Sequence, residues 1–323
     1  MKPIIAVPAL ALLILRAYQR KSLTTTGLVV AALSAFIHTL YPSGLAFTLL
    51  GVFFLLATQA TRVKHDVKAE LTLSAILCLV HLWRYGVGGG GDHDGTDADA
   101  ASRATLGQDR FADLLAVGII CNYVAVTADT LSSELGILSP APPRLITNPL
   151  RTVPRGTNGG VTLLGIWYGY VGSLLIALTS LFFVSFPAGS DSRSSSRIAF
   201  VLALSIWGAL GSLLDSLLGA LVQASVIDRR TGKIVEAAGG TKPSTSTPSS
   251  SSSPAILRNT KEVELKPKPK QEHHPSRQIN SGRDILDNNQ VNFLMASTMT
   301  VWGMVVAASL WKVDLNVLLS TPK

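Results

Sequence analysis

Cysteine and charged residues are scarce in this chain of 323 residues, which contains two cysteines and 15% charged residues. Cys78 and Cys121 each lie within an apolar run, so the sequence offers neither a zinc-ligand spacing nor a disulfide framework. We expect both to pack as small apolar side chains. Soluble proteins contain about 25% charged residues, so the composition excludes an ordinary soluble domain. The formal charge of +8 is spread over short loops and one tail without interleaved aromatic residues, and no nucleic-acid partner is expected.

Long apolar runs are abundant instead, and hydrophobic residues make up 47% of the chain. A membrane-spanning helix needs about 20 predominantly apolar residues, and eight runs approach or exceed that length. They cover roughly residues 3–18, 24–41, 43–60, 71–86, 111–128, 160–186, 197–224 and 290–311. The sequence therefore predicts an all-α, polytopic membrane helix bundle of about seven or eight spans.

The region before the last span has a different composition. Residues 238–283 are rich in Ser, Thr, Pro and Lys and have almost no apolar anchors, so we expect a disordered loop there. The predicted organisation is a membrane bundle with its motif loops over residues 1–237, then this loop, then a final span of the same domain within residues 284–323. The first apolar run lacks a clear cleavage site and no Ser/Arg-rich transit segment is evident. We therefore expect that the first helix is retained rather than cleaved. We also expect the protein to lie in the endoplasmic reticulum or a related endomembrane.

The basic residues predict an orientation for this bundle. If the eight spans alternate in direction, most of the 28 Lys and Arg residues fall in loops on one side. These loops lie around residues 16–21, 62–68, 144–155 and 229–283. By the positive-inside rule this side faces the cytosol, and it also receives the acidic and glycine-rich motifs.

Asp215 lies inside an apolar run, where a carboxylate is costly and marks an ion, proton or substrate site. Gly211, Asp215, Gly219 and Gln223 recur every four residues and therefore share one helix face. Leucines cover the opposite face, so we expect the face of Asp215 to turn inward against other helices. Asp215 is either a Mg²⁺ ligand or a satisfied acid in a closely packed interface. Asp228, one loop further on, is a weaker candidate.

Asp129 and Glu134 follow the fifth apolar run and are five residues apart. A turn or a broken helix near Thr130–Ser133 would let both carboxylates converge on a metal ion. Alternatively, Asp129 and the hydroxyl residues after it cap a helix that ends at Gly136.

A basic, glycine-rich turn, Gly156-Thr157-Asn158-Gly159-Gly160, opens the sixth span. Free backbone N–H groups at a helix N-terminus favour an anion, and Arg151 and Arg155 add positive charge. The turn is not a Walker A motif, because the Gly-Lys-Ser/Thr ending is absent. Arg151 and Arg155 meet anionic lipid headgroups in the alternative interpretation. Arg62 and Lys64, after the third span, are either topology anchors or neutralise a diphosphate in a shared pocket.

Several of these segments together resemble the transmembrane protein 19 family, an integral membrane domain of unknown function whose plant members include phytyl-phosphate kinase. The matching segments follow the family order along nearly the whole chain: residues 20–24, 60–64, 128–136, 143–147, 153–161, 211–223 and 287–292. One departure follows Lys64, where the family usually continues into a polar Arg/Gln-Val…Ala-Asn-Gly stretch. Here Lys68-Ala69-Glu70 runs directly into Leu71. Either the stretch was lost or the gene model omits an exon, and an active site that includes it is then incomplete.

The resemblance implies phosphorylation of an isoprenoid monophosphate, such as phytyl or geranylgeranyl phosphate, to the diphosphate. CTP or ATP would be the donor and Mg²⁺ the cofactor, and the partners are the isoprenoid phosphate lipid and the bilayer. Asp129 and Asp215 then become metal ligands, and Glu134 a further catalytic acid that binds metal or orients the substrate. The implied phosphate-binding residues are Arg155, Thr157, Asn158 and Gly159, with Arg62 and Lys64 as a second group.

Two other functions are compatible with the same residues. A transporter would also use a buried Asp215, broken helices and glycine hinges, but it should show two related halves, and no internal repeat is evident. A non-catalytic membrane scaffold would use residues 238–283 to bind partners. Deleting that segment separates the scaffold from the enzyme, because only the enzyme should keep its activity.

Overall fold

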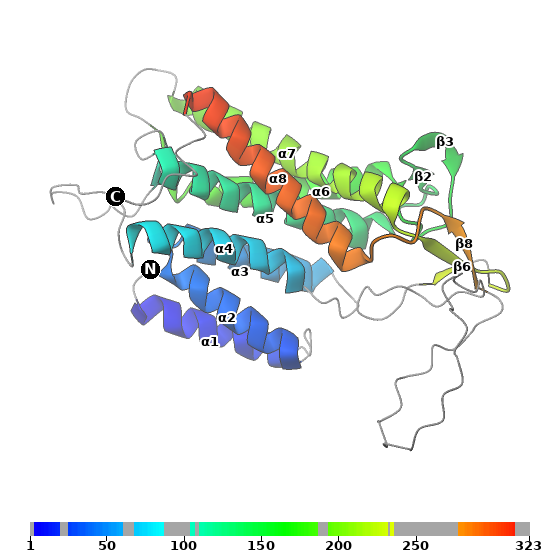
Figure 1. The fold of residues 1–323 in the computed structure, drawn as a ribbon, viewed down its shortest axis with the longest axis horizontal. Helices are drawn as coiled ribbons and strands as arrows, with labels where there is room; N and C mark the ends of the chain where they lie inside the picture. The colour runs from blue at the N-terminus through cyan, green and yellow to red at the C-terminus, as the bar shows by residue number, and fades with distance from the viewer. Residues whose placement is uncertain are drawn as a thin grey trace, which may run out of the picture.

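Each predicted apolar run forms a helix in the computed structural model (Figure 1). The structure describes residues 3–19, 25–60, 68–86, 104–106, 110–186, 193–231, 233–235 and 277–313. Within these residues the helices are α1 (Pro3–Gln19), α2 (Thr25–Leu40), α3 (Leu45–Ala60), α4 (Lys68–Tyr85), α5 (Arg110–Gly136), α6 (Leu163–Ser180), α7 (Arg193–Val222) and α8 (Asn288–Trp311). The predicted all-α class is therefore confirmed.

The helices form two groups that differ in length. α5, α6, α7 and α8 contain 27, 18, 30 and 24 residues, and in the described part of the chain these four are long and apolar enough to cross a membrane. α1, α2 and α3 are shorter apolar helices of 17, 16 and 16 residues. α4 has 18 residues, but its apolar part is the shorter segment Leu73–Tyr85. Figure 1 shows α1–α4 lying along one side of the longer group.

α5 occupies the centre of the bundle. Its apolar stretch is 94% buried, against 39% for α6, 33% for α7 and 39% for α8. α6 approaches α5 through glycines: a Cβ on Gly169 would lie 3.2 Å from the carbonyl oxygen of Ala128, and one on Gly165 would lie 3.2 Å from that of Ser132. Small residues of this kind let membrane helices pack backbone against backbone. α5 is thus shielded by the helices around it.

The turn or broken helix near Thr130–Ser133, which would let Asp129 and Glu134 converge, is absent from the continuous α5. α5 is continuous from Arg110 to Gly136, and therefore Asp129 does not begin a new helix either. The glycines of α6 press on the α5 backbone between Ala128 and Ser132, so packing holds the helix intact through its Thr and Ser residues. The end at Gly136 agrees with the capping interpretation, and Gly136 itself lies against Gly165.

Two three-stranded antiparallel sheets lie at the end of the bundle where α5 and α7 finish (Figure 1). We call this the sheet end. One sheet has the order β3-β2-β4 and the other the order β7-β6-β8. A separate two-stranded parallel pair joins β1, which precedes α5, to β5, which follows α6. The strands are β1 (Ala104–Thr105), β2 (Arg144–Leu145), β3 (Asn148–Thr152), β4 (Gly160–Val161), β5 (Val184–Ser185), β6 (Ser225–Asp228), β7 (Lys233–Val235) and β8 (Arg277–Ser281).

Two predicted boundaries change. The sixth span, expected over residues 160–186, is a helix only from Leu163 to Ser180, because β4 precedes it and a turn with β5 follows it. The loop expected to be disordered, 238–283, ends earlier, since Arg277–Ser281 forms β8 and pairs with β6. Residues 238–276 of that loop lie outside the described part of the chain.

Candidate functional site

Asp129 and Asp215 lie on two helices that run in the same direction, α5 and α7 (Figure 1). The two helices touch where a Cβ on Gly211 would lie 2.9 Å from the Cβ of Ala125. Asp129 follows Ala125 by four residues, and residues four apart share a helix face. Asp215 follows Gly211 by the same four residues. Both carboxylates therefore belong to the faces that meet, one turn closer to the sheet end.

The burial of this pair differs from that of surface acids. Asp129 is 8% exposed, and the Oδ1 atom of Asp215 is buried without a hydrogen-bond donor among the residues that the structure describes. A buried acceptor without a partner is costly and needs a functional or structural explanation. A metal ligand is one such explanation, since a bound cation compensates the carboxylate charge.

The donor set fits Mg²⁺ better than a metal held by protein alone. Among the described residues, no three His, Cys, Asp or Glu side chains gather into a metal-binding group. Mg²⁺ is commonly held by one or two carboxylates together with water and substrate phosphates. The Asp129–Asp215 pair therefore suffices for Mg²⁺ only when a phosphate-bearing substrate supplies further oxygens.

Glu134 does not share the face of Asp129. In a continuous helix with 3.6 residues per turn, five residues correspond to a rotation of about 140° beyond one full turn. Because α5 is unbroken, the two carboxylates diverge. Glu134 is half-buried near the end of α5, and any role for it in the site stays a prediction.

The glycine-rich turn packs onto α7 directly beyond Asp215. Gly156 and Gly159 have φ angles of 84° and 78°, in the left-handed region that only glycine adopts readily. A Cβ on Gly159 would lie 2.8 Å from the carbonyl oxygen of Ser216, and one on Gly219 would lie 3.6 Å from the Gly159 nitrogen. The small-residue face of α7 thus faces inward as predicted, against α5 first and then against this turn.

Polar groups of the turn form hydrogen bonds with other groups of the same chain. The Thr157 hydroxyl donates to the Pro154 carbonyl oxygen at 2.7 Å. The Asn158 side-chain amide donates to the Ala224 carbonyl oxygen at 3.1 Å, and its backbone N–H donates to the Ser225 hydroxyl at 2.9 Å. These bonds fix the turn against the segment that leaves α7. A phosphate role for Thr157 and Asn158 stays a prediction, and both groups also have a structural one.

Arg155 links the same turn to the end of α5. Its guanidinium donates to the carbonyl oxygens of Ile137 and Ser139, which follow the last residue of the helix. The cation thereby lies near the negative end of the α5 dipole. Arg155 is nevertheless exposed, so solvent or a ligand reaches it at the sheet end.

The N-terminus of α6 is less open to an anion than the sequence indicated. The Thr162 hydroxyl caps the helix by accepting a hydrogen bond from the Gly165 N–H at 3.0 Å. This bond satisfies one of the four free N–H groups of a helix start. The glycine-rich turn is therefore a packed connection rather than an open phosphate loop of the Walker type.

Arg62 and Lys64 lie outside the described residues. The helices on either side of them, α3 and α4, finish and begin toward the sheet end (Figure 1). Their expected contact with a phosphate stays a prediction.

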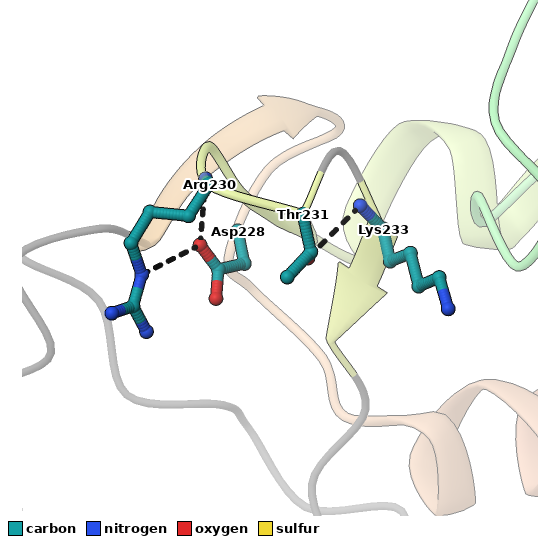
Figure 2. A network of polar contacts seen from close by, with 4 residues as sticks. All are labelled: Asp228, Arg230, Thr231 and Lys233. Carbon is teal, nitrogen blue, oxygen red and sulfur yellow. Dashed lines mark hydrogen bonds and ion pairs between the residues drawn. The ribbon is translucent and has the colours of Figure 1, made fainter.

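Asp228, the weaker acidic candidate, is the last residue of β6 and directly precedes the turn to β7 (Figure 2). Its Oδ1 accepts the backbone N–H of Arg230 at 2.9 Å and lies 3.8 Å from the Arg230 Nε. A carboxylate that bonds the backbone two residues ahead forms an Asx turn. This geometry gives Asp228 a structural role in the hairpin.

Sequence reasoning gave no role to the residues that begin α8. The Asp287 side chain accepts from the Gln290 N–H, and the Gln290 side chain accepts from the Asp287 N–H, both at 2.9 Å. The Asp-x-x-Gln spacing is the signal of such a capping box. Asn292 lies one turn before Met295, a buried residue that packs with Ala125, and so it lies on the side of α8 that faces α5.

A buried polar network between α2, α4 and α5 also lacked a sequence signal. The Tyr123 hydroxyl lies 2.8 Å from the His38 Nε2 and accepts from the Ser74 hydroxyl at 3.2 Å. His38 Nε2 also lies 3.0 Å from the Ser74 hydroxyl. The three residues are 1%, 0% and 0% exposed for Tyr123, His38 and Ser74, so they join the shorter helices to α5 within the core.

The sequence is similar to those of known membrane proteins. A family model described as integral membrane protein DUF92 matches residues 8–300. The chain is 31% identical to Protein PGR of Arabidopsis thaliana over 316 residues, which cover 90% of this chain and 91% of that protein. It is 39% identical over 107 residues to an uncharacterized membrane protein of Methanocaldococcus jannaschii, covering 33% of this chain and 40% of that protein. No solved structure matches.

Proposed function

Because the chain belongs to the DUF92 family of integral membrane proteins, we propose that it is a lipid-phosphate kinase. Its substrate is an isoprenoid monophosphate such as phytyl or geranylgeranyl phosphate, and CTP or ATP is the phosphate donor. The sheet end of the bundle faces the cytosol, where these nucleotides are found. The endoplasmic reticulum or a related endomembrane is the proposed location.

One observation carries this proposal. Two acids on neighbouring helices, Asp129 and Asp215, face the same interface, and the glycine-rich turn packs one turn further along α7. Acids beside hydrocarbon are rare and usually functional. The exposed Arg155 directly precedes that turn. Carboxylates for a metal and cations for phosphates at the same end of a membrane bundle favour chemistry on a phosphorylated lipid.

The proposed reaction needs little covalent chemistry from the protein. A phosphate oxygen of the lipid attacks the γ-phosphorus of the nucleotide, the bond from that phosphorus to the β–γ bridging oxygen breaks, and the nucleoside diphosphate leaves. Such transfers depend mainly on positioning and on charge stabilisation. Mg²⁺ bound at Asp129 and Asp215 would neutralise phosphate charge. Arg155, Arg62 and Lys64 spread the remaining charge, and Gly159 lets the turn pack closely against α7 beside Asp215.

Label transfer tests the proposal directly. The purified full-length chain is incubated with γ-labelled CTP or ATP and with phytyl, geranylgeranyl or farnesyl monophosphate. We expect labelled lipid diphosphate from the wild type and none from Asp215→Asn. The matched control is Asp228→Asn, because asparagine also forms an Asx turn and the hairpin lies outside the acid pair.

The departure from the family pattern between Lys64 and Leu71 requires a second arm of this experiment. The assay is repeated with the polar stretch of related chains restored at that position. Transfer only in the restored chain would show that the stretch belongs to the active site. No transfer by either chain, with either nucleotide, would overturn the proposed function.

A further inference from the structure

A third polar residue, Asn292, belongs to the helix that packs beside the acid pair. It lies near the start of α8, which begins at the sheet end and runs opposite to α5 and α7 (Figure 1). Asn292 is half-buried, whereas the next two residues, Phe293 and Leu294, are 41% and 42% exposed. Ala296 is fully buried, and residues four apart share a helix face. Asn292 therefore lies on the inward face of α8.

Two contacts define how α8 is aligned with α5. A Cβ on Gly118 would lie 2.8 Å from the Met304 Sδ. The Thr300 hydroxyl lies 3.4 Å from the side-chain oxygen of Asn122. From the first contact to the second, the position advances by four residues on α5 and moves back by four on α8. This is the alignment expected of antiparallel helices with the same rise per residue.

The same alignment brings Asn292 to the level of Asp129. Asp129 follows Asn122 by seven residues, and the residue seven positions before Thr300 is Phe293. Because both helices rise about 1.5 Å per residue, Asp129 is level with Phe293 and with its inward neighbour Asn292. The two polar residues therefore lie at the same height on packed helices.

α8 also passes Asp215 on α7. Met295, three residues after Asn292, belongs to a buried cluster against which Leu214 and Leu218 pack. Asp215 lies between these two leucines in the sequence. Since α8 begins at the sheet end, Asn292 lies on the sheet-end side of Met295, toward the glycine-rich turn. A substrate phosphate that approaches the acids from the sheet end would meet this level of α8.

The charge of the site favours a carboxamide at this position. The carboxylates of Asp129 and Asp215 already balance the two charges of Mg²⁺, and a further acid would repel the phosphates of the proposed substrates. The side-chain oxygen of an asparagine is a hard ligand without net charge. Protein kinases hold Mg²⁺ with an aspartate and an asparagine for the same reaction.

We infer that Asn292 is a third protein ligand of the Mg²⁺ held by Asp129 and Asp215, through its side-chain oxygen. The inference rests on the proposed function for the phosphates that complete the coordination, whereas binding of the ion itself requires no turnover. It also gives the capping box a task. By fixing the first turn of α8, Asp287 and Gln290 hold Asn292 at the level of the acids.

Metal binding without turnover tests this inference. The full-length chain in dodecyl maltoside is titrated with MnCl2 in the absence of nucleotide, and free Mn²⁺ is measured by its EPR signal. Mn²⁺ accepts the same oxygen ligands as Mg²⁺. We expect the wild type to bind Mn²⁺ and excess Mg²⁺ to displace it. In Asn292→Leu the Kd should rise on the order of tenfold or more, since even residues that only support a metal ligand contribute that much.

Two further variants separate a ligand from a packing residue. Asn292→Asp keeps an oxygen at this position and should bind Mn²⁺ at least as tightly as the wild type. Thr298→Val is the matched control on α8, because the Thr298 hydroxyl donates to the Leu294 carbonyl oxygen of its own helix at 2.7 Å. It should leave the Kd unchanged. If Asn292→Leu does not fold, Asn292→Ala replaces it, because alanine adds no bulk.

Thermal unfolding without metal is measured on the same variants. A purely structural Asn292 would lower the unfolding midpoint of Asn292→Leu and leave its Mn²⁺ affinity unchanged. That result would overturn the inference. Equal weakening in Asn292→Asp and Asn292→Leu, or a wild type that binds no Mn²⁺, would also overturn it.

Label transfer on the same preparations separates this inference from the proposed function. Mn²⁺ binding that Asn292→Leu weakens, without any transfer from CTP or ATP, would keep the metal site and reject the kinase. Transfer by the wild type, with equal Mn²⁺ affinity in the wild type and Asn292→Leu, would keep the kinase and reject Asn292 as a ligand.

Discussion

The backbone N–H of Asn158 donates a hydrogen bond to the hydroxyl of Ser225 at 2.9 Å, although the two residues are 67 positions apart. The Asn158 side chain adds a second bond to the neighbouring Ala224 carbonyl oxygen at 3.1 Å. Together these bonds join the glycine-rich turn before α6 to the first strand after α7. The position of this turn relative to Asp215 therefore depends on hydrogen bonds between two segments that are far apart in the sequence.

Ser225→Ala should destabilise the protein by about 1 kcal/mol, because the part-buried Asn158 N–H loses its acceptor. Thermal unfolding in detergent measures the change. Ser133→Ala is the control, since the Ser133 hydroxyl is exposed and bonds only the Thr130 carbonyl oxygen of its own helix. We expect the control to change stability by no more than about 0.5 kcal/mol. Equal midpoints for the two variants would refute the structural role of Ser225.

Gly159→Ala and Gly51→Ala should act in opposite directions. At Gly159 a φ of 78° costs an L-residue about 1–2 kcal/mol, and its Cβ would press on the Ser216 carbonyl oxygen. At Gly51, within α3, a Cβ meets nothing within 4 Å, and alanine favours the helix by up to about 1 kcal/mol. Unfolding midpoints that shift in the same direction would show that the turn does not hold this conformation.

Asp215→Asn should remove activity without loss of stability. Activity is expected to fall about 100-fold or more, the range for lost electrostatic stabilisation in a transition state. The folded state should be at least as stable as in the wild type. The reason is that the variant no longer buries a charged carboxylate whose Oδ1 has no described hydrogen-bond donor. Label transfer and thermal unfolding are measured on the same preparation. A less stable variant would identify Asp215 as a structural residue.

Mg²⁺ dependence should distinguish Asp129 from Glu134. EDTA is expected to abolish label transfer and added Mg²⁺ to restore it. In Asp129→Asn, the Mg²⁺ concentration for half-maximal activity should rise on the order of tenfold, whereas Glu134→Gln should leave it nearly unchanged, because the two side chains diverge on a continuous helix. The reverse order of effects would place Glu134 in the metal site.

Tyr123→Phe should lower stability and leave catalysis intact. The change removes the hydroxyl that bonds His38 and Ser74 in the core, and a buried polar group left without its partner costs about 1–3 kcal/mol. Tyr18→Phe, at a residue that is 71% exposed, serves as the control. A loss of label transfer larger than the loss of folded protein would mean that this network communicates with the site.

Much of the fold followed from the sequence because apolar runs of membrane length have few alternatives to a helix. The inward face of Asp215 also followed, since its four-residue spacing with Gly211 and Gly219 is a local property. The path of α5 through Thr130–Ser133 did not, because it is decided by the glycines of α6, more than thirty residues later. Strands of two to five residues likewise carry no periodic pattern.

The site was predictable only in part for the same reason. The acids and glycines indicated a metal and a phosphate. The side chains of Arg155, Thr157 and Asn158, however, donate to backbone carbonyl oxygens, which any sequence would supply. The link from Tyr123 to His38 spans 85 positions, and a lone histidine in an apolar run gives no sign of such a partner. Contacts of this kind depend on the assembled bundle.

The central position of α5 has a consequence for how the protein is made. This helix carries Asp113, Asn122 and Asp129, which are 3%, 1% and 8% exposed in the finished bundle. During synthesis it emerges before α6, α7 and α8, when hydrocarbon would surround those polar groups at considerable cost. We expect α5 to remain at the translocon until α6 has been synthesised and its glycines can pack against α5. Insertion would then proceed as a helical hairpin, and nascent chains truncated between the two helices would be targets for membrane quality control.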